Sequence, residues 1–220
     1  MQFSIPGIIK ESWQVLKTNW IQLLLIWGIA VGVQMVLRLI MTGLGEELSI
    51  LAVMFSLGSQ ILAYIMYAGA IKLELDLIRG KEIEVVEIFN QGKKYAWKFF
   101  LVSLVYSLIV FGGLLLLFVP GVIWSLKYLF ATYATIDDGL GVQEALSLSA
   151  KLTDGIKLKM YGLGIVLFFL NILGLLVFLV GFVVTAAISG LVWPVLYVSL
   201  KKQLLAKDGV SEGQAISSAV

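Results

Sequence analysis

The residues best suited to chemistry in this sequence are a few polar side chains inside long apolar stretches. Lys127 lies in the run LLLLFVPGVIWSLKYLF, residues 114–130, and Arg38, Gln34 and Asn171 have similarly apolar neighbours. A charge at membrane depth costs roughly 3 kcal/mol on insertion scales, so it usually marks a function or a buried pair. Lys127 is therefore a candidate contact for an anion or a lipid phosphate, or part of a transport path. The alternative is a structural ion pair, or a lysine that extends outward to water.

The possible partners of Lys127 are acidic residues near the expected outer side of the membrane. Glu46 and Glu47 occupy a short turn there, and Arg38 lies close enough to join or compete. Gln34 and Asn171 carry no charge, so we expect them to form hydrogen bonds between helices.

The sequence lacks the residues that most often perform catalysis. It contains no cysteine and no histidine, which removes thiolate sites and the commonest general base. Asp137 and Asp138 are neighbours, so on a helix they should point apart and form the polar end of a span; a cation site with Glu144 is a minor alternative. No phosphate-binding loop, zinc spacing or nucleophile elbow is present. We predict no catalytic residue, no metal, no cofactor and no enzymatic activity.

The composition places these residues in a membrane. Of 220 residues, 60% are hydrophobic and 14% are charged, whereas soluble domains carry about 45–50% apolar and about 25% charged residues. We therefore predict an all-α polytopic helix bundle. One transmembrane domain should cover residues 1–206, and a disordered polar tail should cover 207–220.

The apolar runs predict six transmembrane helices arranged as three hairpins. Glycine or proline in the tight connections 43–47, 119–121 and 179–181 allows the chain to reverse. Pro120 should open the fourth helix. The predicted spans are residues 20–42, 48–71, 97–118, 121–136, 159–178 and 182–203.

A short amphipathic helix at the membrane surface is expected before each hairpin, beginning near Ile5, Glu82 and Val142. This arrangement suggests a threefold internal repeat. In the third such helix, Glu144 should lie in the first turn and Gly141 and Gly155 at the two ends. Its shared face contains Val142, Ala145, Leu146, Ser149 and Leu152. By contrast, Lys72, Glu74, Asp76 and Arg79 are expected to form a solvated, ion-paired end of the second helix.

Small residues predict close contacts between helices. Gly28 and Gly32 have the spacing of a close-packing motif, and Gly162, Gly164 and the 186–190 stretch add further small positions. The contacts are internal in a monomer, or they form the seam of an oligomer.

The positive charges predict the orientation. All Lys and Arg residues except Arg38 and Lys127 lie in or beside the N-terminal segment, the loops 72–96 and 137–158, or the C-terminal end. The positive-inside bias then puts both termini and both loops in the cytoplasm, with the chain in the plasma membrane. Anionic headgroups are expected to attract Lys93, Lys94, Lys98, Lys157 and Lys159. Nucleic-acid binding is not expected, because these charges follow the span ends.

Three stretches resemble a known family. They are ESWQVLKTNW, ELDLIRGKEIEVVEIF and LLFVPGVIWSLKYLFATYATIDDGLGVQEALSLSAKLTDG. The family consists of poorly characterised bacterial and archaeal integral membrane proteins with about six helices. It is related to the membrane domain fused to some glycerophosphoryl diester phosphodiesterases. The resemblance covers residues 5–205 and implies a fold and a location. The phosphodiesterase activity is not carried over, because its barrel uses histidine and this chain has none.

These observations favour a non-enzymatic membrane protein that organises the membrane or binds lipids or a partner. Its expected partners are membrane lipids, and a second copy or another membrane protein is also possible. The alternative is a small-solute or ion transporter, or a pore, with a polar path near Lys127.

Overall fold

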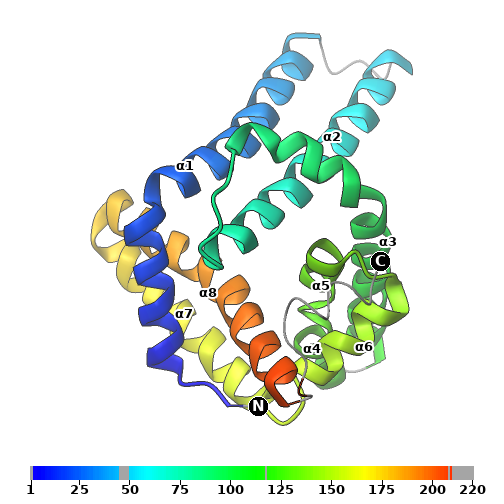
Figure 1. Ribbon diagram of the computed structural model, residues 1–220. Helices are drawn as coiled ribbons and strands as arrows, with labels where there is room; N and C mark the ends of the chain where they lie inside the picture. Colours follow the sequence, from blue (N-terminus) through cyan, green and yellow to red (C-terminus); the bar gives the residue numbers. More distant parts are fainter. Residues whose placement is uncertain (1, 45–49, 117, 208, 210–220) are drawn as a thin grey trace.

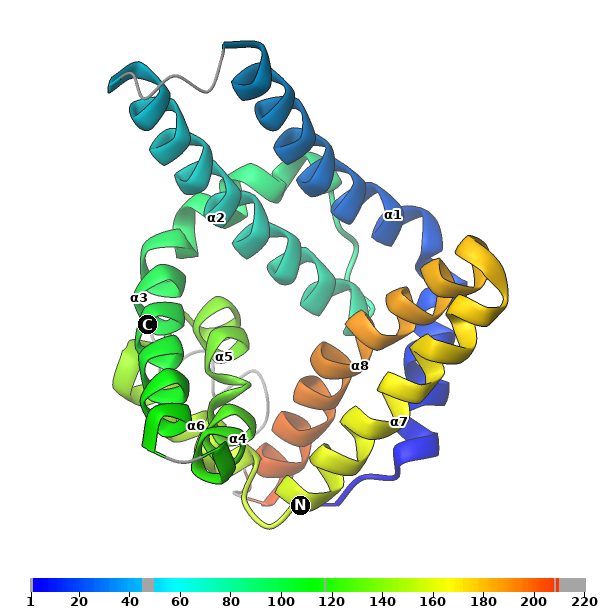
Figure 2. The ribbon, with the colours of Figure 1, turned by 180° about the vertical axis from the view of Figure 1, so that it is seen from behind.

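The computed structural model describes residues 2–44, 50–116, 118–207 and 209, and these residues form an all-helical bundle (Figures 1 and 2). The expected turn residues Glu46 and Glu47, and all of the 207–220 tail except residues 207 and 209, lie outside the described residues. The all-α prediction is confirmed for the described chain, which contains no strand. The helices are α1 (Ile5–Leu44), α2 (Ile50–Ile78), the 3-10 helix η1 (Val85–Glu87), α3 (Ile88–Leu116), α4 (Phe118–Tyr128), α5 (Ala131–Asp138), α6 (Val142–Leu152), α7 (Lys157–Leu176) and α8 (Phe178–Lys207).

Helix α1 joins the expected surface helix to the first expected span. The backbone departs from helical angles at Asn19, where φ is −121° and ψ is 23°. The Asn19 side chain donates to the carbonyl oxygen of Val15 at 3.2 Å, which is a local bond that competes with helical geometry. This kink falls at the predicted boundary between residues 19 and 20.

Long apolar helices dominate the bundle. Four segments of the described chain are long and apolar enough to cross a membrane, namely Ile5–Gly43, Val85–Leu116, Lys157–Leu176 and Gly181–Lys207. They lie in α1, in η1 with α3, in α7 and in α8. The most extensive helix contact is between α2 and α3, followed by α3 with α4, α7 with α8 and α1 with α2, and α1 also packs against α8. The far ends of α1 and α2 project beyond the rest of the bundle in both views (Figures 1 and 2).

The fourth predicted span differs from the structure. Residues 121–136 are not one helix, because α4 ends at Tyr128 and α5 begins at Ala131. At about 1.5 Å per residue, neither the 11-residue α4 nor the 8-residue α5 is as long as a bilayer core. Pro120 lies in the first turn of α4, as predicted.

Helix α6 stabilises the break between α4 and α5. The buried Ser149 hydroxyl accepts a hydrogen bond from the Phe130 N–H at 3.1 Å and donates to the Lys127 carbonyl at 2.9 Å. The Thr153 hydroxyl, also buried, donates to the same carbonyl at 3.2 Å. The backbone groups released by the break therefore have partners, which a buried helix end requires.

Helix α6 also confirms the predicted amphipathic segment. Gly141 precedes its first residue, and the Gly141 N–H donates to the Glu144 carboxylate at 3.1 Å. Ala145, Ser149 and Leu152 are buried, as the predicted face requires. This face packs into a core that includes the fully buried Phe130 and Tyr197.

Glycines allow the closest helix contacts, but not the glycines expected. A Cβ added at Gly69 of α2 would overlap the Ile88 carbonyl oxygen, and one at Gly92 of α3 would overlap the Ile65 carbonyl oxygen. In contrast, nothing described lies within 4 Å of a Cβ built at Gly28, Gly32 or Gly164, and at Gly162 the nearest contact is an ordinary 3.7 Å. The expected internal packing at Gly28 and Gly32 is therefore wrong within the described chain.

The beginning of the chain lies beside the end of α8. The backbone N–H of Gln2 donates to the side chain of Gln203 at 3.0 Å, and the Gln203 amide donates back to the Gln2 carbonyl at 2.9 Å. Figure 1 shows the N-terminus at the end of the bundle where α8 finishes and α7 begins.

Candidate functional site: a buried ionic and aromatic cluster

The four polar residues expected inside spans do not form one site. Arg38 is exposed on the projecting part of α1. Lys127 is half-buried on α4, with its ammonium 5.0 Å from the ring centre of Tyr128. No hydrogen bond or ion pair between described residues joins any two of Arg38, Lys127, Gln34 and Asn171. The structure thus gives each of them separate surroundings.

The side-chain amides of Asn171 and Gln34 differ in their hydrogen bonds. Asn171 of α7 donates to the Ser189 hydroxyl of α8 at 2.7 Å, which is the expected bond between helices. The side-chain nitrogen of Gln34 is buried and has no acceptor among the described residues. The expected interhelical bond is therefore present at Asn171 and missing at the Gln34 nitrogen.

The charged centre of the bundle is Asp137, at the end of α5. Both terminal nitrogens of Arg79, from the end of α2, donate to the two Asp137 oxygens at 2.5 and 2.6 Å. Lys201 of α8 donates to Asp137 at 2.6 Å and to Asp138 at 2.5 Å. The Tyr197 hydroxyl adds a bond to Asp137 at 3.1 Å. We call these five residues the Asp137 cluster.

The Asp137 cluster is buried, so its electrostatics are strong. The side chain of Asp137 is 4% exposed and that of Lys201 is 9% exposed. Burial alone would raise the pKa of Asp137, but the hydrogen bonds and charges of Arg79 and Lys201 hold it well below its ordinary value. Burial and the neighbouring Asp137 charge raise the pKa of Asp138 instead. The cluster thus fixes α2, α5 and α8 together around an ionised Asp137.

Aromatic rings continue inward from the Asp137 cluster. Tyr197 stacks on Tyr133 of α5 with ring centres 5.7 Å apart, and Phe130 tilts against Tyr197 at 5.9 Å. On the far side, the charge of Glu74 acts on Tyr133 and on Tyr67. A charge on Glu74 would therefore be felt at Tyr133, the ring that stacks on Tyr197.

Glu74 is as buried as Asp137 but has different partners. It lies on α2 beyond the stretch expected to span, and it is 3% exposed. The Trp27 indole of α1, which can only donate, hydrogen-bonds its carboxyl group. No ion pair between described residues includes Glu74. Burial raises the pKa of Glu74 to about 8, and the Trp27 hydrogen bond opposes part of that rise.

The expected solvated end of α2 is wrong for two of its residues. Glu74 is buried, and Arg79 pairs with Asp137 rather than with Glu74 or Asp76. Lys72 and Asp76 keep the expected pairing at 3.1 Å, and Lys81 also pairs with Asp76 at 2.9 Å, but the side chains of Lys72 and Asp76 are only 13% and 17% exposed. Adjacent Asp137 and Asp138 were also expected to point apart, yet both contact Lys201.

Sequence reasoning overlooked Tyr197, Lys201 and the importance of Glu74. A usable signal exists for Glu74, since the leucines on both sides of it and two residues further on are buried as well. Leucine and acidic residues alternate along 73–77. This pattern is compatible with a helix that is buried on all sides, and equally with a solvated helix end. Nothing local marks Lys201 as a partner, because Asp137 lies 64 residues away in the sequence.

Groups that would hold a metal ion are missing from the described chain. No set of three or more His, Cys, Asp or Glu residues there is suitably grouped. Asp137 and Asp138 are occupied by cations of the protein, and Glu144 accepts from the Gly141 N–H.

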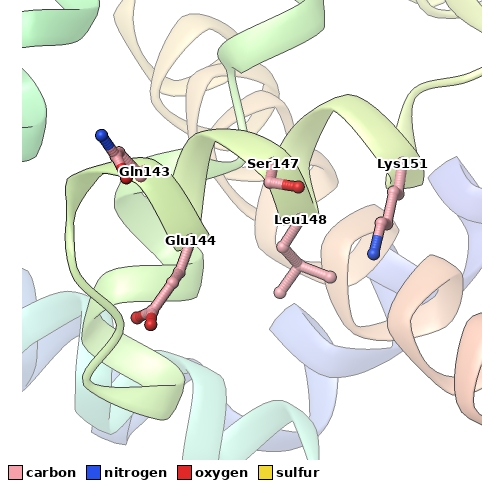
Figure 3. A pocket seen from close by; sticks show the side chains of 5 residues that line it. All are labelled: Gln143, Glu144, Ser147, Leu148 and Lys151. Atoms are coloured by element: carbon pink, nitrogen blue, oxygen red, sulfur yellow. The ribbon is translucent and has the colours of Figure 1, made fainter.

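A hollow of about 400 Å³ lies on the outer face of α6 (Figure 3). All the residues that line it come from this one helix, and it opens to the surface. They are Gln143, Glu144, Ser147, Leu148 and Lys151.

The lysines expected to contact lipid headgroups are distributed over two regions. Lys93 and Lys94 are exposed on α3, with their ammonium groups 5.7 and 5.3 Å from the ring centres of Phe89 and Tyr95. Lys159 is exposed on α7. Lys98 donates to the Gly139 carbonyl at 2.6 Å, and Lys157 lies 3.8 Å from Asp154.

No family model, no curated protein sequence and no solved structure matches this chain. Its function is therefore argued from its own residues.

Proposed function

We propose that the chain is a multi-pass membrane protein without enzymatic activity, which works by binding lipids or a membrane partner. The observation that carries the proposal is the apolar outer surface of the long helices. Leu24 of α1, Leu115 of α3 and Phe168 of α7 are all exposed. Water-soluble monomers rarely leave so much apolar surface in contact with water, whereas hydrocarbon is a favourable solvent for it.

The proposed spans lie in α1 from residue 20, in α2 as far as residue 71, in α3 from residue 97, in α7 and in α8. Helices α4 and α5, as far as residue 136, together form a broken sixth element. Exposed aromatic residues support membrane boundaries at the first residues of the predicted spans in α1 and α3, because amphipathic rings favour the interface. Trp20 and Trp97 are 56% and 70% exposed. The contact between Gln2 and Gln203 supports a shared side for the N-terminus and the end of α8, which an even number of crossings requires.

The proposed lipid contact is made by Lys93 and Lys94. Both ammonium groups are exposed near the first turns of α3, and Trp97 lies one turn further along. Each basic residue near anionic headgroups contributes about 1 kcal/mol. We propose that this basic edge, with Lys159, prefers anionic lipids on the cytoplasmic side of the plasma membrane.

The test compares the thermal stability of the detergent-purified chain after addition of phosphatidylglycerol or phosphatidylcholine. We expect the anionic lipid to raise the melting temperature more, and the difference to shrink in the double variant Lys93→Gln with Lys94→Gln. The matched control removes two other exposed lysines, Lys151→Gln with Lys207→Gln, and should keep the full difference. An unchanged lipid difference in the first variant would contradict the proposed contact.

The alternative, a transporter with a polar path near Lys127, has less support. Such a path needs polar groups in a continuous line, and Lys127, Arg38 and Asn171 lie on different helices without mutual bonds. Flux through liposomes that is abolished by Lys127→Leu would restore this alternative.

A further inference from the structure

Glu74 is a buried acid that forms no ion pair with any residue the structure describes. It is 3% exposed, and Leu73, Leu75 and Leu77 around it are buried as well. A carboxylate in such surroundings is unfavourable unless a cation or several donors compensate it. Since no ion pair between described residues includes Glu74, the neutral carboxyl is the form that this site suits.

The groups that interact with Glu74 from α1, α2 and α5 are uncharged side chains. Helix α1 contributes the Trp27 indole, which is uncharged. Tyr67 of α2 and Tyr133 of α5 are the titratable groups on which its charge acts. All three contribute neutral groups.

Three cations at or near the helices packed against α2 bond to groups other than Glu74. On α8, Lys201 donates to Asp137 and Asp138. On α3, Lys98 donates to the Gly139 carbonyl. Arg79, which directly follows the last residue of α2, donates from both terminal nitrogens to Asp137. Asp137 is thus neutralised by cations of the protein, whereas Glu74, which has no ion pair among the described residues, can be neutralised by binding a proton.

We propose that Glu74 is a proton-binding site, and that loss of its proton loosens the packing of α1 against α2 at Trp27. The protonated carboxyl accepts the Trp27 N–H and fits an apolar setting. The carboxylate needs water or a cation, and neither reaches it while α1 covers α2. This inference goes beyond the proposed lipid binding and does not depend on it.

The site works in an accessible pH range. Burial raises the pKa of Glu74 to about 8. The proton is therefore bound at neutral pH and released under mildly alkaline conditions.

The direct test is infrared difference spectroscopy of the whole chain in liposomes, titrated from about pH 6 to about pH 10. We expect the carbonyl band of a protonated carboxyl to disappear with a midpoint near pH 8. Glu74→Gln should lack this band, and the exposed control Glu84→Gln should keep it. Absence of any such band in the wild type, or its persistence in Glu74→Gln, would overturn the proposal.

The structural part is tested by distances between spin labels. The chain has no cysteine, so Leu24→Cys on α1 and Ile61→Cys on α2 place labels at two exposed positions. We expect the distance distribution to broaden or lengthen above pH 8, and to stay constant in Glu74→Gln. A distribution that does not change with pH, while the infrared band does, would overturn the proposed loosening of α1.

Discussion

Arg79 and Asp137 form a two-bond ion pair across the bundle although 58 residues separate them in the sequence. The pair is supported by Lys201, which contacts both Asp137 and Asp138. The ends of α2, α5 and α8 are therefore joined by charges that are shielded from water.

Removing the Asp137 charge should destabilise the protein. Asp137→Asn leaves Arg79 and Lys201 in place without their common carboxylate, and breaking a buried pair in this way costs about 3–5 kcal/mol. The measurement is unfolding in detergent by heat or denaturant. The control is Asp154→Asn, whose carboxylate is 83% exposed and 3.8 Å from Lys157, and it should cost about 1 kcal/mol or less. Equal losses for the two variants would show that the cluster contributes no more than a surface pair.

Ser149→Ala should weaken the junction of α4, α5 and α6. The variant leaves the buried Phe130 N–H without its acceptor and removes one donor from the Lys127 carbonyl. A buried polar group without a partner costs about 1–3 kcal/mol. Ser147→Ala, on the exposed face of α6, should be close to neutral. Lys127→Met, which keeps the carbonyl, should also change stability by only about 1 kcal/mol. A large loss in Lys127→Met would instead show that the ammonium group is the important feature.

Gly69→Ala should disrupt the contact between α2 and α3. The added methyl group would overlap the backbone carbonyl of Ile88, so the helices must separate. Overpacking of this kind typically costs about 1–3 kcal/mol or more. Gly58→Ala, at an exposed position on the same helix with nothing described within 4 Å, is the matched control. It should be neutral or slightly stabilising, since alanine favours helix. Melting temperatures of the two variants decide between these outcomes.

The pH dependence of stability should reveal Glu74. Its folded pKa, about 8, is above the ordinary glutamate value of 4.5. The folded state therefore binds the proton more tightly, and this contribution is complete below about pH 4.5 and is lost as the pH rises toward 8. The melting temperature of the wild type should decrease from about pH 6 to about pH 9, while Glu74→Gln should show a smaller decrease. Parallel curves for the two proteins would contradict the buried neutral carboxyl.

Properties that depend on local composition could be predicted from the sequence. The predicted apolar spans in α1, α2, α3, α7 and α8 are helical, and the kink at Asn19 and the buried face of α6 fall where the pattern indicates. These features arise within a few residues of the chain. They can be predicted because the order of apolar and polar residues follows the helical period and the surrounding solvent.

Properties that depend on distant partners could not be predicted. The break after Tyr128 is stabilised by Ser149, whose hydroxyl accepts a hydrogen bond from the Phe130 N–H. The two residues are 19 positions apart in the sequence. Whether an acid between leucines faces water or protein depends on which helix covers it, and for Glu74 that helix is α1. The spacing of Gly28 and Gly32 predicted the wrong helix contact for the same reason. The close approach is between Gly69 of α2 and Gly92 of α3, and no local motif links these two residues.

The most direct test of the central claim, a multi-pass membrane protein with both ends on one side, is labelling of single cysteines in sealed vesicles. Glu46→Cys, between α1 and α2, and Gly209→Cys, after α8, are treated with a reagent that cannot cross the membrane. The account predicts that they react from opposite sides. Reaction of both from the same side, or recovery of the chain in solution without detergent, would contradict it.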